Sequence, residues 1–298
     1  TSFYVTEQKL RRIEKSIYID RIVHRWYVDN FMQEHFVKSF SYSSFACLKG
    51  KGMHNACLYV QEMMKHCKRI WNNYYVIKMD VAKYFQNIDK QILYEILCRK
   101  IKDKSLLWLT REILYSNGAD KGLPIGNYTS QCFANIYLNE LDQYMKHKLK
   151  LKYTCRYMDD VVALVNTKEE AIEKLNLIRS FLKDKLCLEL NRKTQIFKST
   201  QGVNFCGYKI NEYRLKIRDK GKRKLKKKVK FLEKQVKQGK MTCIEAHKYL
   251  SGHLGYINVA NTKKLEKSAC FLSRKVANCA NYSEYSQKNY EFRRCRIA

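Results

Sequence analysis

Two adjacent carboxylates, Asp159 and Asp160, lie in the middle of a run of aromatic and β-branched residues. The segment 153–165 therefore predicts two strands folded about Met158, Asp159 and Asp160. Strands joined by so short a turn pair antiparallel, because a parallel pair needs a crossover of about a dozen residues or more. This hairpin excludes a simple doubly wound parallel sheet and predicts an α+β fold for the surrounding chain.

A third carboxylate, Asp80, ends another strand-like segment at residues 74–79. Two strands that deliver acids to one sheet edge could form a two-metal centre, since Mg²⁺ takes oxygen ligands, usually one or two carboxylates together with substrate phosphates. The ordinary alternatives are a solvated turn at Asp159 and Asp160 and a helix cap or turn at Asp80. A bare Asp-Asp pair is more often such a turn, so the three acids alone are only suggestive.

A glycine-containing turn at 122–131 runs into a helix that Thr129 or Ser130 can cap. Backbone N–H groups and a helix N-terminus favour contact with phosphate. Pro124, the single proline of the chain, has the fixed φ that suits such a turn. An ordinary loop-to-helix connection explains this pattern about equally well.

The remaining elements are predicted from apolar periodicity and composition. Helices are expected at 20–36, near 57–64, over 90–117 in one or two pieces, from about 129 to 145, and at about 168–185. Strands are expected at 3–5, near 187–190, at 194–198 and at 203–210. A mixed middle region is thus followed by basic helices.

Lys and Arg total 59 against 28 Asp and Glu, which gives a formal charge of +31. This excess predicts a polyanionic partner, most simply nucleic acid. A lysine-rich proteome is one alternative, although it would usually raise Glu as well, and a basic membrane-surface protein is another. Between Lys216 and Lys240 thirteen residues are basic and two are acidic, which predicts the start of a separate basic helical subdomain.

No run of roughly eighteen apolar residues predicts a transmembrane helix, and no signal-peptide pattern is present. The twelve cysteines are scattered without a Cys-x-x-Cys pair. Reduced thiols in an intracellular compartment are therefore expected, and the predicted location is cytoplasmic. The chain begins with a strand-like segment and not with Met, from which we expect natural N-terminal residues to be missing.

Four segments resemble the reverse transcriptases in their order and spacing. They are Asp80 with Phe85, residues 122–131, residues 157–160, and Asn204 to Tyr208. Within that family, Ile125 to Gln131, which ends in Ser-Gln and is followed by 133–138, resembles the enzymes of diversity-generating retroelements. Most other reverse transcriptases have a Gln-Gly-x-x-x-Ser-Pro type of sequence there, whereas the Tyr-x-Asp-Asp motif is shared by all of them.

The resemblance covers nearly the whole chain and implies a right-hand polymerase with fingers, an antiparallel-sheet palm and a helical thumb. It implies fingers at 1–75 with their N-terminal part truncated, the first catalytic strand of the palm at 76–90, and fingers and palm helices at 91–121. It also implies a palm with the catalytic hairpin and primer grip at 122–215 and a basic helical thumb at 216–298.

Matched position by position, the resemblance assigns the metal centre. Asp80, Asp159 and the backbone carbonyl of Val81 would bind two catalytic Mg²⁺ ions, for which Mn²⁺ could substitute. Asp160 would support them. Lys193 matches a lysine that can protonate the departing pyrophosphate.

The resemblance also implies a nucleotide pocket made by Lys9, Arg11, Phe85, Ile125 and Gln131. Lys9 and Arg11 match basic fingers positions that contact the triphosphate. Phe85 would pack under the deoxyribose and reject a 2′-hydroxyl, because the ring leaves no room for another oxygen. Ile125 would lie beside the nascent base pair, where most reverse transcriptases have Gln. Since an apolar side chain cannot hydrogen-bond there, we hypothesise that it loosens selection, consistent with the family's adenine-directed errors.

Further residues match nucleic-acid contacts of the family. These are Phe205, Gly207 and Tyr208 in the primer grip and Lys49 and Lys51 in a Lys-Gly loop. Lys222, Arg223, Lys226 and Lys227 lie on the basic helix expected to be the thumb, for which a solvated charged helix is the alternative. Phosphate contacts of this kind position a duplex without reading its sequence. The chain departs from the family pattern at Leu48 in place of a basic residue, at Gln86-Asn87 in place of Pro-Ser, and at Tyr128 in place of Leu.

These observations favour an RNA-directed DNA polymerase that copies the template repeat of its element RNA into adenine-mutagenised cDNA. Such enzymes work with dNTPs, a structured RNA and a small basic accessory protein oligomer, so these partners are expected and a membrane is not. Two alternatives stay open: another bacterial reverse transcriptase, from a group II intron, retron or phage-defence system, and a non-catalytic RNA-binding scaffold. Ser130-Gln131 argues against the intron and retron types, and the intact acids argue against the scaffold.

Overall fold

The computed structural model describes residues 2–6 and 10–260. The chain divides into two compact units, Thr1–Cys206 and Gly207–Ala298. The first unit contains the hairpin with the paired acids, and the second contains the strongly basic segment.

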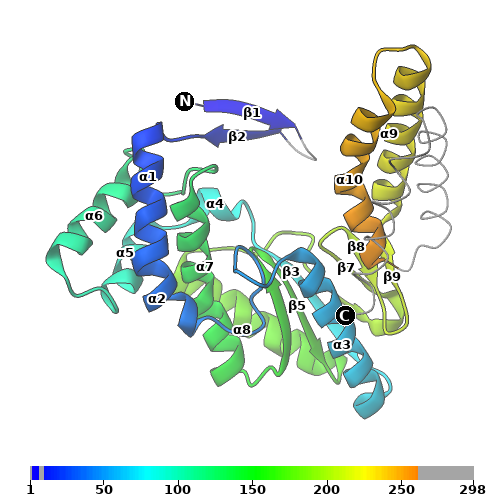
Figure 1. Ribbon diagram of the computed structural model, residues 1–298. Coiled ribbons are helices and arrows are strands. Elements are labelled where there is room, and N and C mark those ends of the chain that lie inside the picture. The colour runs from blue at the N-terminus through cyan, green and yellow to red at the C-terminus, as the bar shows by residue number, and fades with distance from the viewer. Residues whose placement is uncertain (1, 7–9, 261–298) are drawn as a thin grey trace. The chain divides into compact units, whose positions relative to one another are not determined.

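A four-stranded antiparallel sheet organises the first unit (Figure 1). Its strands, in spatial order, are β4 (Tyr153–Tyr157), β5 (Asp160–Val165), β3 (Tyr75–Asp80) and β6 (Gln195–Lys198). β4 and β5 form the predicted hairpin, and β3 lies between β5 and β6. The expected mixture of helices with antiparallel strands is therefore confirmed.

The predicted helices of this unit lie close to their expected ranges, whereas the strand at 10–14 and the short helices at 37–39, 84–87 and 199–201 were not predicted. Further elements accompany the sheet in this unit. They are β1 (Ser2–Thr6), β2 (Leu10–Glu14), α1 (Tyr18–Tyr27), η1 (Val28–Met32), α2 (Gln33–His35), η2 (Val37–Ser39), α3 (Met53–Trp71), α4 (Tyr84–Asn87), α5 (Lys90–Cys98), α6 (Lys104–Tyr115), α7 (Tyr128–Gln143), η3 (Tyr144–Lys148), α8 (Lys168–Leu186), η4 (Ser199–Gln201) and β7 (Val203–Phe205). The helices predicted at 20–36 and 129–145 both contain a π-helical turn, η1 and η3 respectively.

Helices cover both faces of the sheet, because β5 alternates apolar side chains toward each face. Val161, Ala163 and Val165 join the main core with residues of α7 and α8. Val162 and Leu164 are also fully buried, on the face where α3 packs against β4 and β5 (Figure 1). The sheet is therefore a rigid platform, with Asp80 and Asp160 at strand ends and the polar residues Lys78 and Arg156 inside β3 and β4.

The predicted cap of α7 is wrong. The helix begins after Asn127, and Thr129 and Ser130 are buried inside its first turn. The Asn127 side chain does not cap the helix, since its Oδ1 accepts a hydrogen bond from the backbone N–H of Ser16 at 3.2 Å. The residue before the helix is thus used to attach the N-terminal segment to it.

Two predicted strands also differ from the structure. At 187–190 only Leu190 makes an isolated bridge, to Val81. The segment 203–210 is not one strand but contains β7 and, in the second unit, β8 (Tyr208–Ile210). The extended backbone is interrupted because Cys206 and Gly207 both have positive φ, 45° and 86°.

The second unit pairs a small antiparallel ladder with two helices. β8 pairs with β9 (Leu215–Ile217), and α9 (Asp219–Lys237) packs against α10 (Cys243–Val259). Leu225 and Leu232 lie on one face of α9 and are buried, which agrees with a helix that is basic elsewhere. Thr242 and Glu245 form a capping box at the start of α10.

Among the described residues no helix is both long and apolar enough to cross a membrane. The cysteines that the structure characterises are all free thiols. They are Cys47, Cys57, Cys67, Cys98, Cys132, Cys155, Cys187 and Cys206.

Candidate active site

Strand pairing brings the three predicted carboxylates to one end of the sheet. Asp80, the last residue of β3, is the register partner of Asp160, the first residue of β5. Asp159 is held beside them, because its backbone carbonyl accepts a hydrogen bond from the Val81 N–H at 3.3 Å. Three acids and the Val81 peptide are thus assembled from segments that are distant in sequence.

The electrostatics of this edge favour a cation. Burial raises the pKa of Asp159 above its ordinary value, and the neighbouring Asp80 raises it further, whereas Arg11 and Lys78 lower it. A carboxylate that is costly to ionise alone is stabilised when a positive ion lies beside it. In the described part of the chain no three acidic, His or Cys side chains are gathered closely enough to bind a metal by themselves. The oxygen donors still fit Mg²⁺, which commonly uses one or two carboxylates and completes its shell with substrate phosphates.

Lys78 contacts the Asp160 carboxylate and was missed by the sequence analysis. It lies two residues before Asp80 on β3, so both side chains project to the same face. Its Nζ also lies 4.9 Å from the centre of the Phe205 ring. Burial lowers the pKa of Lys78 to about 8, although nearby Cys206, Asp80, Cys155 and Asp159 act in the opposite direction. The sequence could have indicated this contact, because a lysine two residues before Asp80 on a strand lies on the same face as that acid.

A turn of backbone lies against Phe85, the predicted sugar-gate residue. Phe85 is half-buried on the short helix α4, and its carbonyl accepts from the Leu123 N–H at 2.7 Å. The Gly122 N–H donates at 2.8 Å to the carbonyl of Ile88, the residue that follows the same helix. The neighbouring Tyr84 is fully inside the core and donates its hydroxyl to the Ala134 carbonyl of α7. Phe85 is therefore placed by two separate elements.

The same loop contacts the N-terminal hairpin. The Ile125 carbonyl accepts from the Glu14 N–H at 2.8 Å, at the end of β2. Gly126 has φ of 130°, and a Cβ there would lie 3.0 Å from the Glu14 carbonyl oxygen. Arg11 is exposed on β2 and acts on Asp159 electrostatically.

Two other predicted nucleotide contacts are Gln131 and Lys9. Gln131 is exposed in the first turn of α7. Lys9 lies outside the described residues. Of the predicted nucleotide contacts, Phe85 and Ile125 are the two that the backbone hydrogen bonds of the 122–126 loop bring together.

Lys193 lies in a turn that is attached to the first acid. The Asn191 N–H donates to the backbone carbonyl of Asp80 at 2.7 Å. The Asn191 side chain then accepts from the Lys193 N–H at 3.1 Å, which shapes the turn. The Lys193 side chain is exposed.

The predicted primer-grip residues are divided between the two units. Phe205 belongs to the first, where its ring is buried and its carbonyl accepts from the Cys57 thiol at 3.7 Å. Gly207 and Tyr208 belong to the second. The Tyr208 ring stacks on that of Tyr256, with centroids 5.1 Å apart. A role for Phe205 in holding a primer would therefore use its backbone and not its ring.

The two lysines of the Lys-Gly loop differ in availability. Lys49 is exposed. Lys51 donates to the carbonyls of Tyr42 and Ser44 at 2.6 and 2.9 Å, and it lies over the rings of Tyr42 and Phe45. Lys51 thus stabilises its own loop, and Lys49 is the better candidate for a phosphate contact.

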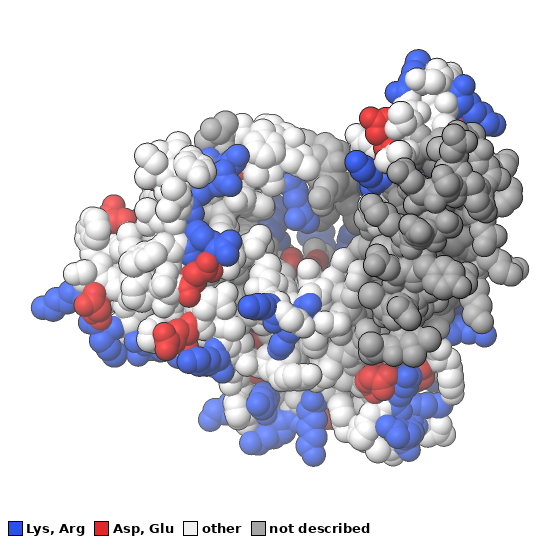
Figure 2. All heavy atoms as spheres, in the orientation of Figure 1, with Lys and Arg blue, Asp and Glu red and all other residues white. Residues whose placement is uncertain are grey.

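The basic helix α9 presents most of its predicted contacts to solvent. Arg223, Lys226 and Lys227 are exposed, whereas Lys222 forms an ion pair with Asp219 at 3.0 Å. Figure 2 shows Lys and Arg side chains spread widely over the visible face of the molecule, with fewer Asp and Glu. A surface of this charge attracts phosphate backbones.

The sequence match to known proteins covers the segments that build this site. Residues 7–210 match the family model described as reverse transcriptase (RNA-dependent DNA polymerase), which is more than half of the 298 residues. The chain belongs to the reverse transcriptase family. The matched range contains the hairpin with Asp159 and Asp160, the 122–131 loop and Asp80, so the expected class of protein is confirmed.

Individual relatives agree with this membership. The chain is 24% identical over 237 residues to the COX1/OXI3 intron 2 protein of Saccharomyces cerevisiae, covering 58% of this chain and 27% of that protein. It is 27% identical over 201 residues to the Retron Ec73 reverse transcriptase of Escherichia coli, covering 62% and 61%. The chain thus spans less than two thirds of the length of these relatives.

The fold is similar to that of a solved telomerase. The structure from Candida albicans, in complex with a TWJ fragment of telomeric RNA, matches with a TM-score of 0.53 and 11% identity. The match covers 78% of this chain and 48% of that one. At this identity the likeness concerns the fold alone.

Proposed function

We propose that this reverse transcriptase is an RNA-directed DNA polymerase that serves a diversity-generating retroelement. The polymerase activity is supported by one observation above all: Asp80 and Asp160 are register partners, with Asp159 held next to them by Val81. Family membership supplies the class of reaction, and the assembled carboxylates supply a place for it.

The carboxylates of Asp80 and Asp159 and the carbonyl of Val81 would hold two Mg²⁺ ions, with Mn²⁺ as a substitute. When bound, such ions activate a primer 3′-hydroxyl and stabilise the charge that develops on the leaving pyrophosphate. Asp160 supports this arrangement from the opposite strand, where Lys78 neutralises part of its charge. Lys193, whose side chain is exposed, would give a proton to the departing pyrophosphate.

The chain's other residues would orient the substrates. Phe85 closes the space under the sugar of the incoming nucleotide, and Arg11 adds positive charge for its triphosphate. Lys49 and the exposed face of α9 would contact phosphates of the RNA template and the DNA product. In this assignment the fingers, palm and thumb are the ranges predicted from the sequence.

The assignment to a diversity-generating retroelement rests on Ile125 and on the Ser130-Gln131 pair. The Ile125 carbonyl accepts a hydrogen bond from the Glu14 N–H, and this contact would keep residue 125 in a fixed place beside the proposed nucleotide pocket. An apolar side chain there gives up a hydrogen bond that Gln would offer, which weakens discrimination between bases. The expected product is cDNA with errors at template adenines, made from the element RNA with a small basic accessory protein as partner.

A retron or intron enzyme is the second candidate. It is favoured by the relatives, one of which is a retron reverse transcriptase and another an intron protein. The two candidates differ in fidelity, since only the first predicts errors directed to adenine. Sequencing cDNA made from a template of balanced composition separates them: an even error spectrum would remove the retroelement assignment and leave the polymerase assignment in place.

The polymerase activity itself is tested by extending a DNA primer on an RNA template with dNTPs and Mg²⁺. The wild-type chain should give full-length product, and Asp159→Ala should lower the rate about 100-fold or more, since a metal-bound transition state is stabilised by several kcal/mol. Asp184→Ala is the matched control, because Asp184 is an exposed acid on α8. Equal extension by wild type and Asp159→Ala would remove the proposal.

A further inference from the structure

A fully buried arginine lies directly before the catalytic turn. Arg156 is on β4, one residue before Tyr157, and its side chain is 0% exposed. Burying a guanidinium costs several kcal/mol unless its charge and its N–H donors are matched. The groups that accept hydrogen bonds from Arg156 therefore indicate its role in the structure.

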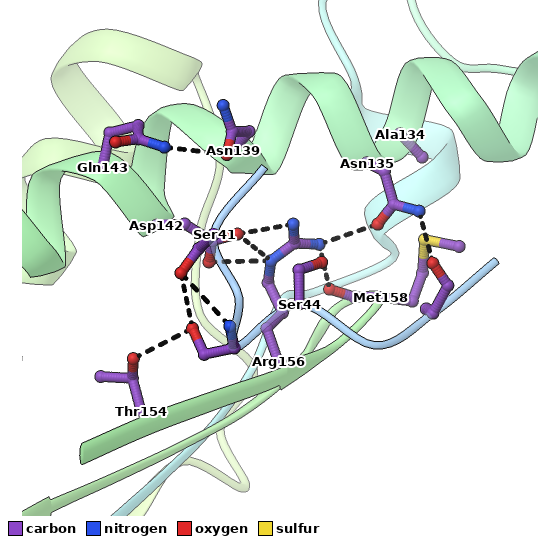
Figure 3. Close-up of polar contacts among 12 residues, drawn as sticks. Ser41, Ser44, Ala134, Asn135, Asn139, Asp142, Gln143, Thr154, Arg156 and Met158 are labelled. Atoms are coloured by element: carbon purple, nitrogen blue, oxygen red, sulfur yellow. Dashed lines mark hydrogen bonds and ion pairs between the residues drawn. The ribbon is translucent and has the colours of Figure 1, made fainter. Parts of the chain in front are cut away.

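The guanidinium is held by helix α7. Its Nε lies 2.9 Å from each Asp142 carboxylate oxygen, and its Nη2 donates to Oδ2 at 2.7 Å (Figure 3). Its Nη1 donates to Asn135 Oδ1 at 3.1 Å. Asp142 and Asn135 lie about two turns apart on one face of α7, so the helix fixes the plane of the guanidinium. Asn135 is itself oriented by donating to the Ala46 carbonyl at 2.8 Å.

One hydrogen bond of this group reaches the catalytic turn. Nη1 of Arg156 also donates to the backbone carbonyl of Met158 at 3.1 Å (Figure 3). Met158 has φ of 55°, a left-handed conformation that costs a non-glycine residue about 1–2 kcal/mol. A conformation of this cost persists only where neighbouring groups impose it.

The next peptide is held from the other side. The carbonyl of Asp159 accepts from the Val81 N–H at 3.3 Å, at the end of β3. The two peptides that flank the Asp159 Cα are therefore each held by one hydrogen bond. The Met158 carbonyl accepts from Arg156, and the Asp159 carbonyl accepts from Val81. With both carbonyls fixed, the direction of the Asp159 side chain toward the end of β3 is restricted.

We propose that Arg156 is a positioning residue, which acts through the Met158 carbonyl to fix the Asp159 carboxylate for metal binding. This inference rests on the proposed polymerase function. Arg156 touches no substrate. It transmits the rigidity of α7 to the catalytic turn, so that the metal ligand is already placed before the metal arrives.

A purely structural ion pair between Arg156 and Asp142 is the competing explanation, and two variants separate them. The double variant Arg156→Met/Asp142→Leu replaces the pair by apolar residues of similar volume, an exchange that is often neutral or stabilising. It removes the contact to Met158. Arg156→Lys keeps a buried charge for Asp142, but an ammonium lacks the planar fork needed to reach Asn135 and Met158 as well.

The test measures kcat, the KM for dNTP and the Mg²⁺ concentration for half-maximal primer extension, together with Tm. Both variants should fold and should lower kcat about 10- to 100-fold while raising the Mg²⁺ requirement, as loss of a partner that orients a metal ligand does. The KM for dNTP should change little. Lys90→Met is the matched control, since Lys90 is also fully buried and bonded to Asn117 but lies on α5. It should lower Tm without changing the Mg²⁺ requirement.

A folded double variant with wild-type kcat and Mg²⁺ dependence would overturn the proposal. The proposal would also be overturned if kcat decreased in proportion to the decrease in Tm, both in the Arg156 variants and in Lys90→Met. If the double variant does not fold, Arg156→Lys is judged by the same two outcomes.

Binding of Mn²⁺, followed by electron paramagnetic resonance, tests the inference separately from catalysis. It should weaken in both Arg156 variants relative to wild type, and unchanged binding would count against the positioning role. Absence of primer extension by the wild-type chain would instead remove the proposed function, and the Mn²⁺ measurement would still decide whether Arg156 positions a metal ligand.

Discussion

The backbone N–H of Leu123 donates a hydrogen bond to the carbonyl of Phe85, with 2.7 Å between nitrogen and oxygen. The preceding N–H, of Gly122, donates to the carbonyl of Ile88 at 2.8 Å. These two bonds attach the loop that carries Ile125 to the helix that carries the proposed sugar gate. The two sides of the proposed nucleotide pocket are therefore expected to shift together.

Gly122→Ala should disturb this attachment. Gly122 has φ of 85°, and a Cβ would lie 3.1 Å from the Gln86 carbonyl oxygen. Gly118→Ala is the matched control, because Gly118 also has positive φ but no atom within 4 Å of the added Cβ. Both variants should lose about 1–2 kcal/mol of unfolding free energy from the left-handed conformation, as measured by urea denaturation. Only Gly122→Ala should also raise the KM for dNTP, and an equal KM in the two variants would contradict the coupling.

Phe85→Ala should allow ribonucleotides into the pocket. The ring is half-buried against Tyr84, and its removal opens space where a 2′-hydroxyl would lie. Discrimination between dNTP and rNTP, measured as the ratio of kcat/KM, should fall about 10- to 200-fold, the range expected when a steric contact is lost. Tyr84→Phe keeps both rings and removes only the bond to Ala134, so it should retain discrimination. Unaltered selectivity in Phe85→Ala would show that another residue is the gate.

Ile125→Gln should make the enzyme more accurate opposite template adenine. The new amide can hydrogen-bond beside the nascent base pair, which is worth about 0.5–1.5 kcal/mol and so about a 2- to 10-fold lower error rate. Ile125→Leu is the control that keeps the site apolar. The measurement is sequencing of cDNA from a defined RNA template. If the Gln and Leu variants make errors at the same rate, Ile125 does not set the spectrum.

The parts of the site that could be predicted from sequence are those determined by local pattern. The hairpin at Asp159 and Asp160 follows from strand composition on both sides of two acids, and the strand that ends at Asp80 follows in the same way. The helices follow from apolar spacing, because each buries one face against the sheet or against another helix. Local rules do not depend on which segments meet in space.

The missed residues all depend on which segments meet. Arg156 and Asp142 pair because β4 passes beside α7, and no periodicity in either segment indicates that crossing. Lys78 reaches Asp160 only through the register of β3 with β5. The predicted cap at Thr129 or Ser130 is wrong because α7 begins after Asn127, whose side-chain oxygen accepts from Ser16. Hydrogen bonds and ion pairs between polar side chains of distant segments could therefore not be predicted from local sequence patterns.

Stability should decrease as the pH falls below neutrality, and His24 should be one cause. His24 lies on α1 with only 6% of its surface exposed, and its Nδ1 is 3.4 Å from the Thr129 hydroxyl. Burial lowers the pKa of His24, and the opposing effect of Asp20 is smaller. The unfolded state therefore takes up a proton first as the pH falls through about 6.5, while the folded state still has a neutral ring.

The contribution of His24 is thus complete above about pH 6.5 and is lost between that value and the lower folded pKa. Urea unfolding at pH 7.5, 6.5 and 5.5 measures this loss. His24→Gln should reduce the dependence on pH, because glutamine cannot titrate, whereas His35→Gln should leave it unchanged since His35 is exposed. If wild type and His24→Gln lose the same unfolding free energy as the pH falls, the buried imidazole is not the group responsible. The decrease would then come from carboxylates.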